Sequence, residues 1–181
     1  WAAIKVGLDW LGIKFDQEKN TTDDIEMLYD KCVEMIKKNH AYVCTCKRDT
    51  ISKNRREMMS CECSAGDVKQ NEERWKQMFD KYKPGEAIVR FRGDMESKNT
   101  VMRDPVLFRI NDARHPRLAE KYRVWPSYDF AVAVEDYTDG ITHALRSKEY
   151  ELRNELYHAI LDALGMKHPK MLEFSRLEFK G

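Results

Sequence analysis

The chain has no long apolar run and almost no net charge. No stretch approaches the ~20 consecutive apolar residues that a membrane-spanning helix needs, and no signal-peptide pattern opens the sequence. Lys and Arg number 32, Asp and Glu 31, and the formal net charge is +1. The chain therefore lacks the basic excess of a nucleic-acid-binding tail. We expect a soluble, cytoplasmic protein that has neither a membrane nor DNA as a partner.

Cysteine is scarce, with five residues in 181. An odd count in a charged sequence of this kind argues against a disulfide framework and favours free thiols or a metal site. Four of the five form two Cys-x-Cys units, fourteen residues apart, which can supply four thiolates to a tetrahedral zinc ion. Unliganded thiols are the alternative, and His40 is near enough in sequence to replace one cysteine. The four candidate ligands are Cys44, Cys46, Cys61 and Cys63.

Helical periodicity is clearest in the first forty residues. Ile4, Leu8 and Leu11 recur at helical spacing and indicate the close of a helix at Gly12. A second helix is expected over about residues 24–38. Its predicted buried stripe consists of Ile25, Leu28, Cys32, Met35 and Ile36.

Beyond residue 43 the apolar periodicity gives way to cysteines and charges. A polar stretch around residues 71–82 is predicted to be helical, and residues 87–92 alternate as in a strand. The alternation assigns Arg90 and Arg92 to one face of that strand. This change of pattern indicates an inserted segment, here called the insertion, that begins near residue 44.

The insertion carries a local excess of positive charge. Between positions 90 and 123 there are nine Lys or Arg against five Asp or Glu, interleaved with aromatic residues. Such a surface can follow a phosphate backbone. A solvated face of an antiparallel sheet is the alternative.

Arg146 closes a short apolar strand predicted for residues 140–145. Ser147 is a good N-cap for the helix expected over residues 148–164. Ligand sites in parallel α/β sheets lie at such carboxyl ends of strands. A guanidinium in an apolar strand needs an anionic partner, so Arg146 is a candidate for binding an anion.

Four stretches, in this order, resemble the class I glutamyl- and glutaminyl-tRNA synthetase family in its archaeal and eukaryotic form. The resemblance covers nearly the whole chain, and four ordered motifs are far more specific than a single short one. The stretches are residues 103–110 (RDPVLFRI), 121–126 (KYRVWP), 125–146 (from WPSYDF to GITHALR) and 173–177 (EFSRL).

The resemblance implies an α/β fold. It consists of the second part of a class I synthetase Rossmann-like catalytic domain with an inserted α/β connective domain that binds the acceptor stem. Residues 1–43 would close the first half of the catalytic domain, 44–122 form the insertion, and 123–181 belong to the second half. The family's His-Ile-Gly-His-type and Lys-Met-Ser-Lys-Arg-type motifs are absent from the sequence. We therefore interpret the chain as a piece of a longer synthetase and expect it to be inactive alone.

The resemblance implies glutamate, ATP with Mg²⁺, and tRNA as ligands, and some members of the family bind zinc in the insertion. Tyr128 and Arg146 match positions that contact the amino acid, and Tyr150, four residues and thus one helical turn after Arg146, should wall the same pocket. A guanidinium suits a γ-carboxylate, whereas the glutaminyl branch has a small neutral residue at this strand end and a glutamine where Met171 stands. Both positions favour the glutamyl branch.

The remaining expected contacts concern ATP and tRNA. Arg176 and Leu177 match residues along ATP, while Leu152 replaces an acidic residue with which glutaminyl members read a base pair. Two alternatives remain, namely a glutaminyl-tRNA synthetase and a catalytically silent tRNA-binding fragment. The expected phosphate contacts are Arg90, Arg103, Arg109 and Arg117.

Overall fold

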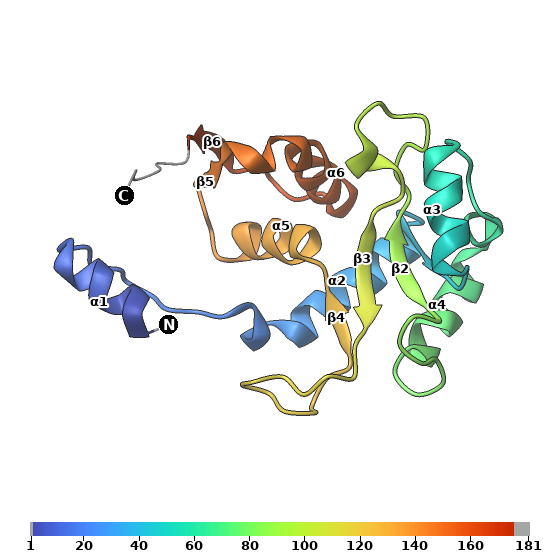
Figure 1. Cartoon of the computed structure of the whole chain (residues 1–181), viewed down its shortest axis with the longest axis horizontal. Helices are drawn as coiled ribbons and strands as arrows, with labels where there is room; N and C mark the ends of the chain where they lie inside the picture. The colour runs from blue at the N-terminus through green and yellow to red at the C-terminus, as the bar shows by residue number, and fades with distance from the viewer. Residues whose placement is uncertain (1, 176–181) are drawn as a thin grey trace.

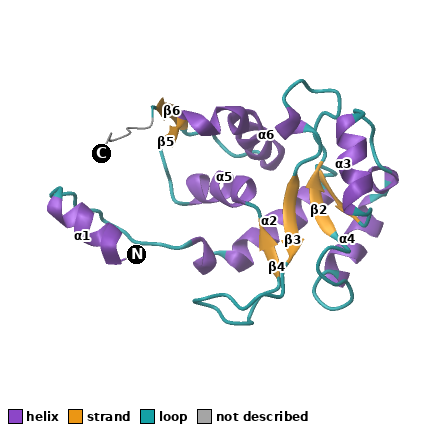
Figure 2. Cartoon of the chain, in the orientation of Figure 1, coloured by secondary structure: helices purple, strands orange, loops and turns teal. Residues whose placement is uncertain are grey.

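The computed structural model describes residues 2–175. It is an α/β arrangement of a four-stranded antiparallel sheet, a two-stranded parallel sheet and helices packed around them (Figure 1, Figure 2). Within this range no helix is both long and apolar enough to cross a membrane. The α-helices are α1 (Ala2–Trp10), α2 (Ile25–Lys37), α3 (Arg48–Arg56), α4 (Val68–Gln77), α5 (Tyr128–Thr138) and α6 (Asn154–Leu164). The strands are β1 (Ala41–Cys44), β2 (Ile88–Phe91), β3 (Val106–Ile110), β4 (Val124–Pro126), β5 (His143–Ser147) and β6 (Lys170–Phe174). Short 3₁₀ helices are η1 (Thr21–Asp23), η2 (Glu62–Ala65), η3 (Thr100–Met102) and η4 (Lys148–Arg153).

Helix α2 forms where the sequence predicted it, and its buried face is the predicted stripe. All five stripe residues are at most 1% exposed. Full burial of each aliphatic side chain contributes roughly 1.5–3 kcal/mol, which outweighs the modest helix propensity of the polar face. The chain leaves the helix through Asn39, whose φ of 60° is a left-handed conformation that asparagine tolerates. The turn delivers β1 directly onto the sheet that α2 covers.

The antiparallel sheet has the strand order β1-β2-β3-β4. Its register sets Tyr42 opposite Arg90 and Val89 opposite Phe108. Val89 and Phe108 are fully buried in the main core. Since β1 begins at Ala41 and β4 at Val124, one hydrogen-bonded sheet crosses the expected domain boundaries at 43/44 and 122/123.

The parallel pair β5-β6 packs beside helices α5 and α6 (Figure 1). The expected strand at 140–145 is shifted, because Gly140 (φ 70°) lies in the turn after α5 and pairing starts at His143. The expected helix at 148–164 begins as the 3₁₀ helix η4 and becomes α-helical at Asn154. It ends at Gly165 in a left-handed conformation, as the sequence predicted.

Helix α1 lies apart from the rest of the molecule in Figure 1, joined to it by an extended segment. Gly12, with a φ of 68°, ends the helical run as predicted. The apolar residues of this helix are not buried, since Ile4 is 57% and Trp10 84% exposed. The helical periodicity therefore predicted the helix correctly, but it did not predict that the apolar residues of this helix are exposed.

Candidate functional site

Arg146 is a buried cation on the inward face of β5. Alternation along the strand buries Ala144 and Arg146, the latter only 7% exposed. The guanidinium carbon lies 4.2 Å from the ring centroid of Tyr157, and Nη2 lies 3.7 Å from Oδ2 of Asp136. Among the residues that the structure describes, Nη2 has no hydrogen-bond acceptor. The charge is balanced locally by Asp136, and this donor is unsatisfied, as is Nη2 of Arg90.

Asp136 is held by a second contact. The Tyr157 hydroxyl donates a hydrogen bond of 2.9 Å to Asp136 Oδ2, the oxygen that faces Arg146. Burial raises the pKa of the Asp136 carboxyl, while the Tyr157 hydrogen bond and the charge of Arg146 oppose the rise. The three side chains come from α5, β5 and α6, so the packing of these elements fixes the guanidinium in place.

The two tyrosines expected beside Arg146 lie next to each other. The rings of Tyr128 and Tyr150 have centroids 5.4 Å apart. Tyr128 is the first residue of α5, and Ser127 caps that helix by accepting the amide of Phe130. Burial raises the pKa of Tyr128 and the charge of Arg146 opposes that rise, so the phenol lies within the electrostatic reach of the guanidinium. The two rings thus form a partly exposed aromatic pair that joins the start of α5 to η4.

Strand β6 lies beside Arg146 but only part of the expected ATP site is visible. The register pairs Arg146 with Glu173, and Asn154 donates a hydrogen bond to the Glu173 carboxylate. Arg176 and Leu177, the expected ATP contacts, lie outside the described residues.

The four cysteines of the two Cys-x-Cys units converge on one point. Their sulfur atoms all lie within 4.8 Å of one another. Sulfurs of Cys44 and Cys61 are 3.8 Å apart, and those of Cys46 and Cys63 are 3.7 Å apart. Zn–S bonds of about 2.3 Å place tetrahedral sulfurs roughly 3.8 Å apart, so this donor set fits a zinc ion. His40, the alternative ligand, is exposed and does not belong to the group.

The four sulfurs of the cluster differ in the protonation state that they favour. The hydrogen bond with Cys61 and burial raise the pKa of Cys44, and burial raises the pKa of Cys46 to about 11, so these two favour the thiol. A hydrogen bond from Cys44 lowers the pKa of Cys61 to about 4, against the opposing effect of burial, and Tyr42 and Arg90 act in the same direction. The Tyr42 hydroxyl and Arg90 Nη1 each lie 3.6 Å from the Cys61 sulfur. A metal ion needs deprotonated sulfur, so these neighbours favour a ligand thiolate at Cys61, while Cys44 and Cys46 would release their protons on binding the ion.

The structure corrects two of the four expected phosphate contacts. Arg90 is 1% exposed and donates to the carbonyl of Asp104 at 2.8 Å. Arg103 is 8% exposed and donates to the carbonyls of Ser97 and Arg55. Neither guanidinium lies on the surface, because each satisfies backbone carbonyls that the fold buries. Both therefore have structural roles here and are withdrawn as phosphate contacts.

The two other expected contacts remain on the surface. Arg109 is exposed on β3, and its side chain has no ion pair or hydrogen bond with another described residue. Arg117 is exposed as well, although Nη2 pairs with Asp23 at 3.1 Å. The common face predicted for Arg90 and Arg92 is confirmed, since both guanidinium groups lie over the Tyr42 ring, but that face is turned towards the protein.

Two site residues escaped sequence reasoning. Asp136 follows Ala133 and Phe130 at the i, i+3 spacing of the buried face of α5, and a carboxylate on an apolar helical stripe was the available signal. Tyr157 lies among the buried residues of α6, and nothing local distinguishes it from an ordinary core tyrosine.

Comparison with known proteins places these geometries in a family. The whole chain, residues 1–181, matches the family of tRNA synthetases class I (E and Q), catalytic domain. The chain belongs to this family. It is 64% identical over 181 residues to a glutamate–tRNA ligase of Cenarchaeum symbiosum and 64% identical over 180 residues to one of Nitrosopumilus maritimus. The first match covers 100% of this chain and the second 99%, but each covers only 32% of the relative. The chain therefore spans about a third of the length of these relatives.

Solved structures confirm the fold. A glutamate–tRNA synthetase from Elizabethkingia anophelis matches with a TM-score of 0.66 at 18% identity, covering 98% of this chain and 41% of that one. A glutamate tRNA ligase from Elizabethkingia meningosepticum, solved in complex with its amino acid, matches with a TM-score of 0.62 at 20% identity, covering 98% and 40%. The expected synthetase-like α/β fold is thus confirmed.

Proposed function

We propose that this chain is the part of a glutamate–tRNA ligase that selects glutamate by its side-chain carboxylate. The observation that carries the proposal is Arg146, a buried guanidinium with a free donor beside the exposed ring of Tyr128. A carboxylate can accept two parallel hydrogen bonds from such a fork. Asp136 balances the charge before glutamate binds, and Tyr157 keeps Asp136 from swinging away.

The same geometry disfavours glutamine. A neutral amide placed against Arg146 would leave the cation poorly paired and would bring its NH₂ towards a donor. Met171 lies opposite Ala144 on β6 and packs against the core. A thioether is only a weak acceptor and donates no hydrogen bond to an amide oxygen. Both features support the glutamyl activity over the glutaminyl one.

The reaction needs positioning more than side-chain chemistry. The α-carboxylate of glutamate attacks the α-phosphorus of ATP and displaces pyrophosphate, and a terminal ribose hydroxyl of tRNA then attacks the acyl carbon and releases AMP. Arg146 would anchor the far end of the substrate, and Tyr128 and Tyr150 would wall its aliphatic part. Mg²⁺ accompanying ATP would neutralise phosphate charge, with Arg176 and Leu177 beside the nucleotide. We further propose that the enzyme is cytoplasmic and that residues 44–122 form the insertion that binds the acceptor stem of tRNA.

The decisive test is Arg146→Cys in the full-length ligase. Loss of a charged contact in a buried pocket costs roughly 1.5–3 kcal/mol, so kcat/KM for glutamate should fall by about ten- to a hundredfold. The KM for ATP should change little, since Arg146 faces the amino acid. Steady-state kinetics with both substrates measure the two effects.

A matched control uses the same chemistry two residues away. Lys148→Cys removes an exposed cation of η4 and should leave glutamate kinetics unchanged. Adding Met171→Gln to Arg146→Cys should shift preference towards glutamine, because it provides an amide partner after the rejecting cation is gone. An unchanged kcat/KM for glutamate in Arg146→Cys would remove this arginine from the pocket.

We also propose that Cys44, Cys46, Cys61 and Cys63 bind one structural zinc ion. The support is the mutual spacing of their sulfurs, which matches a tetrahedral tetrathiolate. Cys44 ends β1 and Cys46 follows it, while Cys61 is the N-cap of η2 and Cys63 lies within it. The ion would therefore tie two segments that share no helix or strand.

Metal analysis of the full-length ligase should find about one zinc per chain attributable to this cluster. A chelator should lower the melting temperature, because structural zinc contributes folding free energy. Cys32→Ala is the control, since Cys32 is buried in α2 away from the cluster and should leave the zinc content unchanged. Equal zinc content in wild type and Cys61→Ser would contradict the assignment.

Arg109 and Arg117 remain our proposed phosphate contacts for tRNA. Both are exposed, and each contact should release about one counterion on binding. Arg109→Ala should therefore reduce the salt dependence of tRNA affinity by about one unit and weaken all tRNAs similarly.

A further inference from the structure

The segment that joins β2 to β3 reaches the amino-acid side of the molecule through Asn99. Its Nδ2 donates two hydrogen bonds of 2.8 Å, one to the backbone carbonyl of Leu152 in η4 and one to the carboxylate of Glu155 in α6. These partners lie 53 and 56 residues further along the chain. Helix η4 begins shortly after Arg146 and carries Tyr150. Asn99 therefore contacts the short helix that connects two of the expected glutamate contacts.

Helix η4 has little burial to hold it in place. It is a 3₁₀ helix of six residues, all of which the structure describes and none of which is buried. Hydrogen bonds in a 3₁₀ helix have poorer geometry than those in an α-helix, so the helix itself is weakly stable. Its position therefore depends on a few contacts with other elements. These contacts include the Arg153–Asp129 ion pair, the ring of Tyr150 against that of Tyr128, and the hydrogen bond from Asn99 to the Leu152 carbonyl.

The loop that carries Asn99 is closed at its base. The Asp94 amide donates to the Met102 carbonyl at 3.0 Å, and a Cβ at Gly93 would lie 1.9 Å from that carbonyl oxygen, so only glycine fits there. The Oδ1 of Asn99 accepts the amide of Val101 at 3.1 Å and thereby caps η3. The oxygen of the side-chain amide thus meets a donor and its nitrogen meets two acceptors. This pairing fixes the orientation in which Nδ2 points towards η4.

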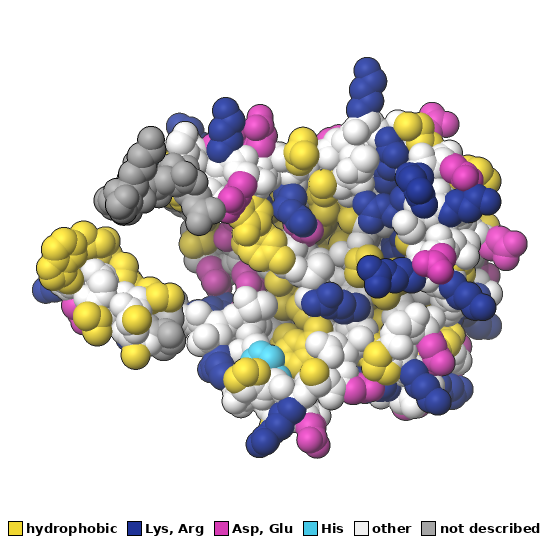
Figure 3. All heavy atoms as spheres, in the orientation of Figure 1, with side chains coloured by type: hydrophobic (Ala, Val, Ile, Leu, Met, Phe, Trp, Pro, Cys, Tyr) yellow, Lys and Arg dark blue, Asp and Glu magenta, His cyan; other side chains and the backbone are white. Residues whose placement is uncertain are grey.

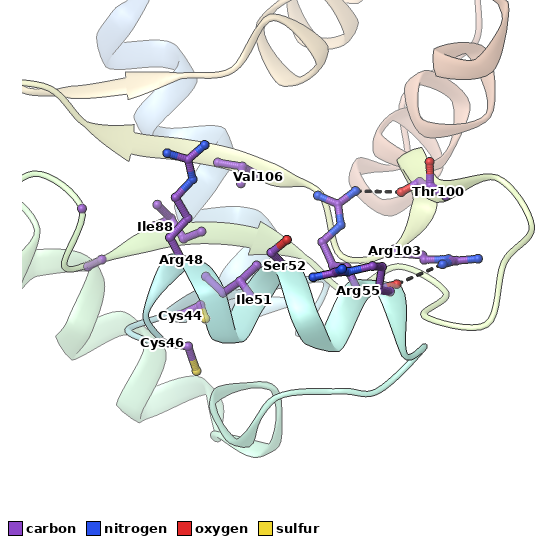
Figure 4. Close-up of a pocket in the computed structure, with 13 residues that line it drawn as sticks. Cys44, Cys46, Arg48, Ile51, Ser52, Arg55, Ile88, Thr100, Arg103 and Val106 are labelled. Atoms are coloured by element: carbon purple, nitrogen blue, oxygen red, sulfur yellow. Dashed lines mark hydrogen bonds between the residues drawn. The ribbon is translucent and has the colours of Figure 1, made fainter.

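Helix α3 holds the other side of this loop. Arg55 donates to the Thr100 carbonyl at 2.7 Å, and Arg103 donates to the carbonyls of Arg55 at 2.9 Å and of Ser97 at 2.8 Å (Figure 4). Both arginines line a pocket of about 560 Å³ between α3 and the strands β2 and β3. Figure 3 shows Lys and Arg side chains gathered over this region, and these two bind carbonyls of the protein. The loop is anchored to α3, so Asn99 offers η4 a fixed point of attachment.

We propose that Asn99 is a positioning residue for glutamate. It holds η4, which keeps Tyr150 against Tyr128 and fixes the chain that leaves Arg146. Asn99 acts through the Leu152 backbone and not by touching the substrate. Asparagine suits this role because one short side chain can accept from η3 and donate to η4 at the same time. The inference rests on the proposed glutamate site and adds to it a residue of the segment between β2 and β3.

Two variants of the full-length ligase separate the contact with η4 from the cap of η3. Asn99→Ala removes both. Asn99→Asp keeps an oxygen for the Val101 amide, but it removes the donor to Leu152 and places a second carboxylate beside Glu155. Each variant should raise the KM for glutamate by about three- to tenfold, as expected for the loss of one or two hydrogen bonds. The kcat and the KM for ATP should stay near their wild-type values, because a positioning defect confined to the amino-acid pocket weakens glutamate binding.

Asn111→Ala is the matched control. The Oδ1 of Asn111 accepts the amide of Ala113 at 3.1 Å, which is the same local hydrogen bond that Asn99 makes with Val101. Among the described residues, no hydrogen bond of the Asn111 side chain reaches η4. This variant should keep the wild-type KM for glutamate. Partial unfolding of any variant lowers the active fraction and hence the apparent kcat, whereas KM reports only on the folded enzyme.

The outcomes separate this proposal from the function it rests on. A raised KM for glutamate in both Asn99 variants, with Asn111→Ala unchanged, supports the positioning role. If Asn99→Ala raises this KM and Asn99→Asp does not, the cap of η3 is responsible and the proposal is overturned. If neither Asn99 variant changes it while Arg146→Cys lowers kcat/KM for glutamate, the positioning role is overturned and the glutamate site stands. If Arg146→Cys also has no effect, the glutamate site fails and the role of Asn99 fails with it.

Discussion

Arg90 on β2 and Arg146 on β5 are both buried in strands, and both lie beside a tyrosine ring and a carboxylate. In each set the tyrosine hydroxyl donates to the carboxylate oxygen that faces the guanidinium, at 2.7 Å beside Arg90 and 2.9 Å beside Arg146. The sets are Arg90 with Tyr42 and Asp104, and Arg146 with Tyr157 and Asp136.

The two arginines differ in how many guanidinium donors form hydrogen bonds with the protein. Arg90 donates through Nε to the carbonyl of Asp104 and through Nη1 to the sulfur of Cys61. The side chain of Arg146 makes no hydrogen bond to any described residue, and the ion pair with Asp136 balances its charge. The same residue types therefore build a structural clamp around Arg90, of which only Nη2 lacks an acceptor, and leave the guanidinium of Arg146 without a hydrogen bond, which is why we propose Arg146 as the anion receptor. What separates them is the number of guanidinium donors that the described residues leave without an acceptor.

The largest expected effect is on folding. Arg90→Met should lower the free energy of unfolding by about 3–5 kcal/mol, because it strips a buried carboxylate of its cation and orphans a carbonyl. Arg146→Met should cost less than about 2 kcal/mol, since Asp136 keeps the hydroxyl of Tyr157 and is partly solvated. Thermal melting of the two variants in the full-length ligase compares them. Equal losses would mean that the two arginines are structural to the same degree.

A smaller effect is expected from the two tyrosine hydroxyls. Tyr42→Phe and Tyr157→Phe each delete one hydrogen bond to a carboxylate, worth roughly 1.5–3 kcal/mol. Tyr42→Phe should lower the melting temperature without changing the KM for glutamate. Tyr157→Phe should raise that KM several-fold, because Asp136 no longer holds the guanidinium in one position. If both variants changed only stability, the proposal of Arg146 as the anion receptor would be refuted.

The smallest effect is a pH dependence at Asp136. Burial raises its folded pKa, so the folded protein holds this proton more tightly than the unfolded chain does. Its contribution to stability is then present at low pH and is lost as pH rises from about 4, the unfolded value, through the folded value. The asparagine of Asp136→Asn does not titrate. The melting temperature of this variant minus that of wild type should therefore increase across that pH interval and stay constant above it.

Asp30→Asn controls for the loss of one negative charge, because Asp30 is an exposed residue of α2. The difference in melting temperature between Asp30→Asn and wild type should change less with pH than the difference for Asp136→Asn. A flat difference for Asp136→Asn as well would mean that its carboxyl titrates alike in the folded and unfolded chain.

Elements whose signal is local were predictable from the sequence. The buried stripe of helix α2 was predicted correctly, because apolar residues that recur with the helical period of 3.6 can be recognised directly in the sequence. Helix α3 was missed, since its residues are almost all polar and it buries none of them fully. The pocket that α3 borders was therefore invisible from sequence. For the same reason the arginines that line it could not be distinguished from ordinary surface charge.

The sequence by itself determined which chemistry the chain carries, namely a thiol quartet, an arginine on an apolar strand and two tyrosines near it. The tertiary structure alone decided which of these groups meet. It brought the two Cys-x-Cys units within 4.8 Å, and it buried Arg90 while leaving Arg109 exposed. The physical reason is that proximity and burial depend on how separate elements pack. The residues next to a side chain in the sequence do not show which distant residue will contact it.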